Sequence, residues 1–276
     1  LRRGAAGFRL DVADELPDAF IEKIRAAVKR VSPEKFLLGE VWEDATTKYG
    51  FGHRRTYLLG KGLDSVMNYP FKNAVLDFVK GKPAQQAAGE ILSICEHYPA
   101  PALNTALNFL STHDTERALT VIADEPANGR GREWQSGRNV SGEAYEEGML
   151  RLRMAYAIIY TLPGLPCLYY GDEIGMQGYR DPFNRGYYCW DSHEERLKPV
   201  LAQLAQLRHS CEAFRTGALR VLRAEGGVLH YQRVGATETA EIIVNRSEHI
   251  IVEPLASGKH TEVNPMGFTI VVEENG

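Results

Sequence analysis

The segment Ala6–Asp14, which reads A-G-F-R-L-D-V-A-D, decides the fold that we expect for this chain. Residues 7–12 have the pattern of a short buried β-strand, but they include the charged pair Arg9 and Asp11. An unpaired charge inside a sheet is costly. Strand alternation places both side chains on one face, where the guanidinium can keep the carboxylate ionised. The pair is therefore either a structural ion pair or part of a functional site.

Strands and helices alternate along residues 1–212, which predicts an α/β unit with a parallel sheet. Helix 17–31 is expected to bury the face that carries Phe20, Ile24, Ala27 and Val31. After the strand at 7–12, further strands are predicted at 36–42, 63–69, 106–110 and 165–170, and further helices at 71–79, 84–97, 143–162 and 196–209. The polar stretch 123–141 is expected to be a long loop.

Short β-rich runs separated by Gly, Asn and Pro occupy residues 213–276. They predict a small antiparallel β-domain after the α/β unit. We therefore divide the chain at 212/213.

The composition excludes several classes of partner. The chain has 276 residues, a net charge of -4 and a pI near 6.1, which argues against binding to nucleic acid or to an anionic membrane surface. The uncharged stretch 155–170 is interrupted by prolines, so we interpret it as a buried helix followed by a strand. The four cysteines are widely spaced, which favours reduced thiols, a cytoplasmic location and no metal cluster.

Three carboxylates stand at or just after the ends of predicted parallel strands: Asp11, Glu40 and Asp114. The carboxyl ends of barrel strands converge on one face, so these side chains can meet there although they are far apart in sequence. Any one of them could be a helix cap or a structural ion pair. Arg9 before the first and His113 before the third make a shared site the better interpretation.

Three segments resemble signature regions of the α-amylase family, glycoside hydrolase family 13. They are G-F-R-L-D-V-A-D-E at 7–15, L-L-G-E-V-W at 37–42 and F-L-S-T-H-D at 109–114. The runs L-D-S-V-M-N-Y-P-F at 63–71 and D-P-F-N-R at 181–185 resemble the neopullulanase and cyclomaltodextrinase branch of that family.

The resemblance implies retaining hydrolysis of an α-glucan or maltooligosaccharide. Asp11 would be the nucleophile that forms a covalent glycosyl-enzyme, and Glu40 the general acid and then the base. Asp114 would bind sugar hydroxyls and stabilise the transition state. This chemistry needs two carboxyls about 5–5.5 Å apart, one of them ionised and the other protonated in a less polar setting. Apolar neighbours at 36–38 and Trp42 are expected to supply that setting for Glu40.

The resemblance also assigns substrate-binding residues. His113 would hydrogen-bond the sugar, Arg9 would hold Asp11 ionised, and Asp181 and Arg185 would clamp the next sugar, although a surface ion pair is the alternative for that pair. Trp42 is expected to stack on a sugar, whereas Tyr69, Tyr170, Tyr187, Tyr188 and Trp190 are expected mostly to pack in the interior. Thr112 replaces the asparagine of chloride-dependent members, and we expect no cofactor and no metal.

The implied fold is strands 4 to 8 of a (β/α)8 TIM barrel followed by a small antiparallel β-sandwich. No segment matches the family's first signature region, so the first three strands are expected upstream of Leu1. Open barrel edges expose apolar surface, which favours a homo-oligomer or an N-terminal fragment that covers them.

Three functions stay open on the sequence. The first is hydrolysis of α-1,4 bonds, with tolerance of α-1,6 bonds. The second is transglycosylation, in which a sugar hydroxyl replaces water as the acceptor. The third is a non-catalytic carbohydrate-binding or interaction relative, which the three retained carboxylates argue against.

Overall fold

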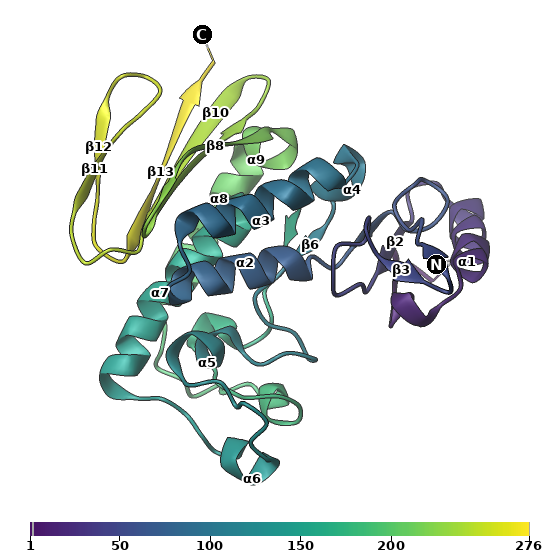
Figure 1. Ribbon diagram of the computed structural model, residues 1–276, viewed down its shortest axis with the longest axis horizontal. Coiled ribbons are helices and arrows are strands. Elements are labelled where there is room, and N and C mark those ends of the chain that lie inside the picture. Colours follow the sequence, from purple (N-terminus) through teal and green to yellow (C-terminus); the bar gives the residue numbers. More distant parts are fainter. Residues whose placement is uncertain (2, 276) are drawn as a thin grey trace.

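Five short parallel strands form the wall of an incomplete barrel in the computed structural model, which describes residues 1 and 3–275 (Figure 1). The strands are β1 (Gly7–Leu10), β2 (Phe36–Gly39), β5 (Ser65–Val66), β6 (Leu107–Asn108) and β7 (Leu165–Pro166). The first three pair in the order β1-β2-β5, and β6 pairs with β7. A parallel bridge between Met67 and Leu107 joins the two groups. The chain order of the strands is thus their spatial order, which confirms the predicted partial barrel.

Helices connect successive strands and enclose the core. They are α1 (Asp18–Val31), α2 (Tyr69–Lys80), α3 (Ala84–His97), α4 (Ala100–Asn104), α5 (Ala118–Ala123), α6 (Arg132–Gln135), α7 (Gly142–Thr161), α8 (Leu197–Ser210) and α9 (Ala213–Thr216). The central helix α7 contacts α2, α5 and α8, and its second half, from Met154 to Ile159, is fully buried. The predicted helices at 71–79, 84–97, 143–162 and 196–209 therefore agree with α2, α3, α7 and α8.

The first strand differs from its prediction. Strand β1 ends at Leu10, so Asp11 lies in the turn that follows and does not share a strand face with Arg9. The strand pairs only with β2, and Phe8 is half exposed, because β1 is an edge here. A buried strand was the wrong expectation for this segment.

The buried face of α1 also differs from the prediction. Ile21 and Val28 are buried, whereas Phe20 and Val31 are exposed. Ile21 and Val28 pack into the hydrophobic core, and Ile24 packs partly against it. The same side of the helix carries Arg25 and Lys29, which donate to the carboxylate of Asp64 at 2.7 and 2.8 Å.

The C-terminal region is an antiparallel β-domain, as predicted. Its strands are β8 (Ala218–Glu225), β9 (Val228–Val234), β10 (Glu238–Asn245), β11 (Ile251–Pro254), β12 (His260–Val263) and β13 (Gly267–Glu274). The order β13-β10-β9-β8 forms one sheet, and β11 pairs with β12 as a separate hairpin. Helix α8 ends at Ser210 and β8 begins at Ala218, and the division at 212/213 stays a prediction.

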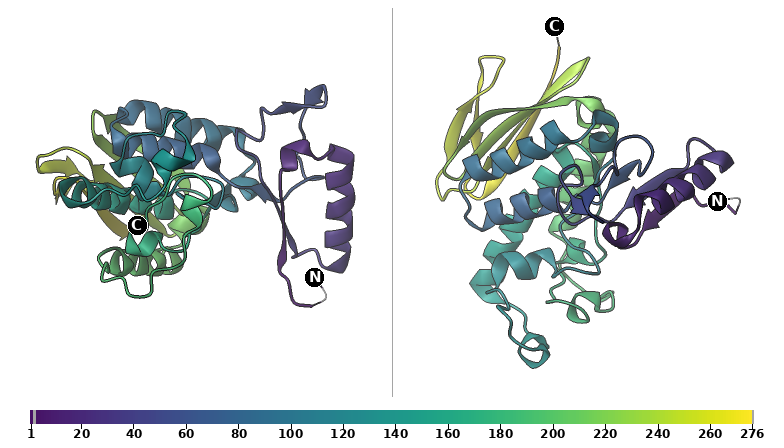
Figure 2. Two further views of the ribbon diagram at one scale, coloured as in Figure 1. Left: turned by 90° about the horizontal axis from the view of Figure 1, so that it is seen from below. Right: turned by 45° about the vertical axis from the view of Figure 1, so that its right-hand side comes forward.

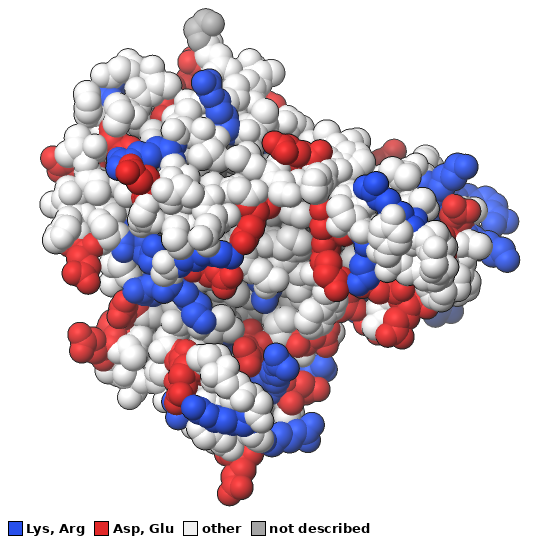
Figure 3. Space-filling model, in the orientation of Figure 1, with Lys and Arg blue, Asp and Glu red and all other residues white. Residues whose placement is uncertain are grey.

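The long polar stretch 123–141 is an ordered loop that contains α6. Arg138 donates to both oxygens of Asp124, and the guanidinium groups of Arg130 and Arg138 both lie over the Trp134 ring. Charges of both signs are intermixed on the face of the molecule shown in Figure 3. The loop is therefore held by its own ion pairs and by cation–π contacts.

The apolar stretch predicted as a helix and a strand is the end of α7 followed by β7. Within the described residues no helix has the length and apolar character needed to cross a membrane. All four cysteines are free thiols. The cytoplasmic location stays a prediction.

One side of the barrel is open. The segment that contains β1 and α1 stands apart from the helical body and the β-domain in both views of Figure 2. Strand β1 forms one edge of the wall and β7 the other. Exposed apolar side chains lie on both, including Phe8 on β1 and Leu165 on β7.

Candidate active site

The guanidinium of Arg9 brings the three predicted catalytic carboxylates together. Its Nη1 donates to Asp11, and its Nη2 lies 3.0 Å from Glu40 Oε1 and 3.9 Å from Asp114 Oδ2. Asp11, Glu40 and Asp114 follow β1, β2 and β6, and β5 lies between β2 and β6 in the barrel wall. The convergence predicted from the sequence is therefore present.

The turn after β1 sets Asp11 and Glu40 in different environments. Val12 adopts a left-handed conformation with φ 41°, and its N–H donates to Glu40 Oε2 at 2.9 Å. The side chain of Asp11 is 72% exposed, whereas that of Glu40 is 4% exposed. The exposed carboxylate is open to a substrate, and the buried one is fixed by the protein.

Hydrogen-bond donors surround Glu40. Besides the N–H of Val12, the indole Nε1 of Trp42 donates to Oε1 at 3.1 Å, and the Tyr69 hydroxyl donates to the same oxygen at 3.4 Å, whereas Arg9 makes an ion-pair contact with that oxygen. Burial raises the pKa of Tyr69, so its hydroxyl remains a donor at neutral pH. Buried Leu37 and Leu38 lie on the preceding strand. The setting is buried as expected, but it is more polar than the apolar one predicted.

Asp114 contacts His113 and Arg185. His113 Nε2 lies 2.9 Å from Asp114 Oδ2, and Arg185 Nη2 lies 3.5 Å from Asp114 Oδ1. Arg185 also contacts Asp181 at 3.3 Å and donates from Nε to the carbonyl of His113 at 3.0 Å. Asp181 therefore reaches the site through Arg185, and the clamp pair adjoins the turn that bears His113 and Asp114.

The aromatic residues divide into two groups. The Trp42 ring is stacked on Tyr69 with centroids 4.5 Å apart, and Trp42 is 46% exposed beside Glu40. Its stacking on sugar stays a prediction. Tyr69 is buried as expected, but Tyr187 and Trp190 are 99% and 86% exposed. Interior packing was the wrong expectation for these two and for Tyr170, which is 40% exposed.

Comparison with known proteins identifies the family. The model of the α-amylase catalytic domain matches residues 1–216. The chain belongs to the α-amylase family.

Similar members of the α-amylase family are enzymes that are named for glucan or cyclodextrin substrates. An amylopullulanase from Thermoanaerobacter thermohydrosulfuricus is 34% identical over 246 residues, which are 83% of this chain and 15% of that protein. A cyclomaltodextrinase from Geobacillus thermopakistaniensis is 32% identical over 255 residues, 90% of this chain and 38% of that protein. The chain therefore spans well under half the length of these curated relatives.

Solved structures of α-amylase family members have the same fold. The ligand-free cyclic α-maltosyl-(1→6)-maltose hydrolase from Arthrobacter globiformis superposes with a TM-score of 0.83 and 26% identity, over 99% of this chain and 57% of that one. A type III pullulan hydrolase from Thermococcus kodakarensis superposes with a TM-score of 0.79 and 26% identity, over 98% of this chain and 45% of that one. The likeness covers the partial barrel and the β-domain together.

A buried polar network lies next to the turn that bears His113 and Asp114, and the sequence analysis did not find it. Asp172 accepts hydrogen bonds from Ser111 and Tyr156, both at 2.6 Å, and pairs with Arg117 at 3.1 Å. Ser111 Oγ also accepts from the N–H of Ala118, which closes the turn. Desolvation raises the pKa of Asp172 to about 6, although its hydrogen bonds and Arg117 oppose that shift.

The raised pKa predicts a stabilising effect of acid. Between about pH 4 and pH 6, Asp172 binds more protons in the folded state than in the unfolded state, so its contribution to the free energy of unfolding increases as the pH falls. Asp172→Asn should lack this increase in the free energy of unfolding, which amounts to about 1–3 kcal/mol between those two pH values. Urea unfolding of both proteins at several pH values measures the difference.

Asp64→Asn is the control for that measurement. Lys29 and Arg25 help to lower the pKa of Asp64 against the effect of its burial, so its contribution to stability is lost as the pH falls. The two variants should therefore change the slope of stability against pH in opposite directions. An unchanged slope for Asp172→Asn would contradict the assignment.

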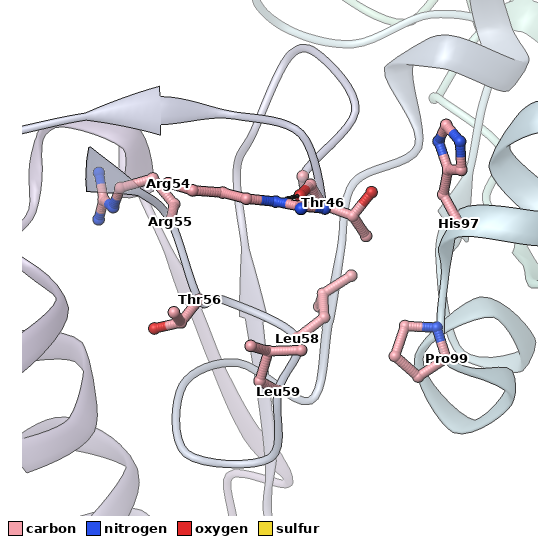
Figure 4. Close-up of a pocket in the computed structure, with 9 residues that line it drawn as sticks. Thr46, Arg54, Arg55, Thr56, Leu58, Leu59, His97 and Pro99 are labelled. Carbon is pink, nitrogen blue, oxygen red and sulfur yellow. Dashed lines mark hydrogen bonds between the residues drawn. The ribbon is translucent and has the colours of Figure 1, made fainter. Parts of the chain in front are cut away.

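A cavity lies away from the three carboxylates. It has a volume of about 290 Å³ and lies between the loop at 45–59 and the segment that joins the end of α3 to the start of α4. Figure 4 shows Thr46, Arg54, His97 and Pro99 around it. No predicted catalytic or sugar-binding residue lines it.

The described part of the chain contains no group of three or more His, Cys, Asp or Glu side chains that could hold a metal ion.

Proposed function

We propose that this chain carries the catalytic residues of a retaining α-glucan hydrolase. The observation that carries the proposal is the contact of one guanidinium, that of Arg9, with Asp11, Glu40 and Asp114. One exposed and one buried carboxylate in the same site suit a nucleophile and a fixed acid–base group.

In the proposed reaction, a carboxylate oxygen of Asp11 attacks the anomeric carbon, and the bond from that carbon to the leaving oxygen breaks. Glu40 in its protonated form gives its proton to the leaving oxygen. Glu40 then takes a proton from water, whose oxygen attacks the anomeric carbon and displaces Asp11. Each step conserves charge and protons, and the two steps together return both carboxyls to their starting states.

The other residues of the site bind and orient the sugar in this proposal. Asp114 and His113 bind hydroxyl groups of the reacting sugar, and Arg185 with Asp181 holds the neighbouring sugar. The exposed face of Trp42, opposite its contact with Tyr69, is the platform for a sugar ring. Arg9 places one positive charge against the three carboxyl groups of the site.

The proposed substrates are α-1,4-linked maltooligosaccharides, with tolerance of α-1,6 bonds. The relatives are named for cyclomaltodextrin and pullulan substrates, which supports this class. Transglycosylation is the second candidate, since a sugar hydroxyl can intercept the same glycosyl-enzyme. A carbohydrate-binding role without catalysis is the alternative from another class.

Turnover of maltooligosaccharides tests the proposal. The chain is incubated with maltoheptaose, and Asp11→Asn measured in parallel subtracts any contaminating amylase. Glucose and maltose above that background support hydrolysis, and products longer than the substrate support transglycosylation. Binding without any turnover by the folded chain would favour the non-catalytic alternative.

We expect the open barrel edges to be covered by a second copy of the chain or by a further strand-forming segment. Exposed apolar residues on β1 and β7, such as Phe8 and Leu165, support this expectation. Sedimentation velocity at micromolar concentration measures it. A compact monomer with nothing bound contradicts the proposal, whereas a dimer supports the second copy.

A further inference from the structure

Asn184 lies inside the D-P-F-N-R segment, between the two residues of the sugar clamp. It belongs to the 3₁₀ turn η3 (Phe183–Arg185), and its side chain is fully buried. The amide Nδ2 lies 3.2 Å from the carbonyl oxygen of Thr112 and 2.8 Å from those of His113 and Thr115. One side chain thus contacts three carbonyl oxygens of the turn that bears His113 and Asp114.

Only an amide-like donor suits this position. Three carbonyl oxygens converge on one buried point, and a buried carbonyl without a donor costs about 1–3 kcal/mol. The NH₂ group of asparagine supplies two hydrogens that the three oxygens share. An ionised aspartate would place a negative oxygen against them, and alanine would leave them without a donor.

The same turn is held from the solvent side and from within. Arg185 Nε donates to the carbonyl of His113 at 3.0 Å, and the N–H of Asp114 donates to Thr112 Oγ1 at 3.1 Å. Asn184 and Arg185 are adjacent in η3, and they supply one buried and one exposed hydrogen-bond donor to the turn. Through these two donors η3 fixes the position of the His113 backbone.

The two polar atoms of the Asn184 amide differ in their contacts, since Nδ2 donates to the turn and Oδ1 does not accept a hydrogen bond from the described residues. Its Oδ1 is buried and has no hydrogen-bond partner in the described structure. The packing around η3 is also tight, because a Cβ at Gly178 would overlap the carbonyl of Phe183. The contacts of Nδ2 with the three carbonyls of the turn account for the orientation of the amide.

We propose that Asn184 is a positioning residue that sets the direction of His113 and Asp114 toward the sugar. It touches no substrate and acts through the backbone of the turn. This inference rests on the proposed function, because Asp114 and His113 matter only if they bind the reacting sugar. A displacement of about 1 Å at such groups is enough to lower turnover about 10²-fold.

The test uses Asn184→Ala and the isosteric Asn184→Asp, with Asn139→Ala as the matched control on the exposed loop at 124–141. The first readout is the NMR signal of the His113 imidazole and of the Asp114 amide, assigned with His113→Gln. Both signals should shift in the two Asn184 variants and stay in place in the control. Unchanged signals in a folded variant would overturn the proposal.

The second readout is kinetic. With maltoheptaose, kcat should fall about 10²-fold and KM should change less than about threefold in both Asn184 variants. If one of the two Asn184 variants fails to fold, the variant that folds decides. A rise in KM of about 10²-fold without a fall in kcat would overturn the positioning role.

The two readouts separate this inference from the proposed function. If the chain and Asp11→Asn have the same turnover, the proposed function fails, and the NMR signals still decide whether Asn184 sets the turn. If Asp11→Asn loses turnover and the Asn184 variants keep it, the positioning inference fails while the proposed function stands.

Discussion

Glu40→Gln is expected to lose about 10²–10⁴-fold in turnover of maltoheptaose, because the leaving sugar then receives no proton. The loss should depend on the leaving group. A maltooligosaccharide with an activated aryl leaving group needs no acid in the first step, so a burst of released phenol should remain. The glutamine keeps the shape of the side chain that Trp42 and the N–H of Val12 contact.

Asp11→Asn is the matched variant for this experiment. It removes the nucleophile, so both the natural and the activated substrate should lose turnover together. Addition of azide should restore product formation by Glu40→Gln and should yield a glycosyl azide, since a small anion attacks the glycosyl-enzyme without a base. Equal losses on both substrates in Glu40→Gln would contradict its role as the acid.

The convergence of the carboxylates could be predicted because it depends on strand ends. Asp11, Glu40 and Asp114 each follow an apolar run, and parallel strands deliver such positions to one face whatever their detailed length. The strand lengths themselves were not predictable. β6 and β7 have two residues each, because pairing depends on neighbours that are distant in sequence.

Contacts that involve the backbone were also beyond sequence reasoning. Asn184 reads as an ordinary polar residue in a turn, and its role appears only when three carbonyls of a segment some 70 residues earlier face it. The buried face of α1 was assigned wrongly for a similar reason. Apolar spacing favoured Phe20 and Val31, but the neighbouring face with Ile21 and Val28 packs into the core, and Arg25 and Lys29 on that side pair with Asp64.

Arg233 is expected to be the strongest single link between the barrel and the β-domain. It is fully buried on β9. Its Nη1 donates to the carbonyl of Thr161 at the end of α7 at 2.7 Å, and its Nε and Nη2 donate to the carbonyl of Gly217 at 3.1 and 2.8 Å. Desolvation lowers its pKa to about 10, so the guanidinium remains charged at neutral pH.

Arg233→Met should therefore lower the free energy of unfolding by about 2–5 kcal/mol. The methionine fills part of the space but leaves the carbonyls of Thr161 and Gly217 buried without donors, at about 1–3 kcal/mol each. Arg220→Met, at an exposed position of β8, is the control and should change stability by less than about 0.5 kcal/mol. Urea unfolding followed by tryptophan fluorescence and by circular dichroism measures both. A loss equal to the control would mean that apolar packing of α7 against β10 and β13, and not Arg233, joins the two parts.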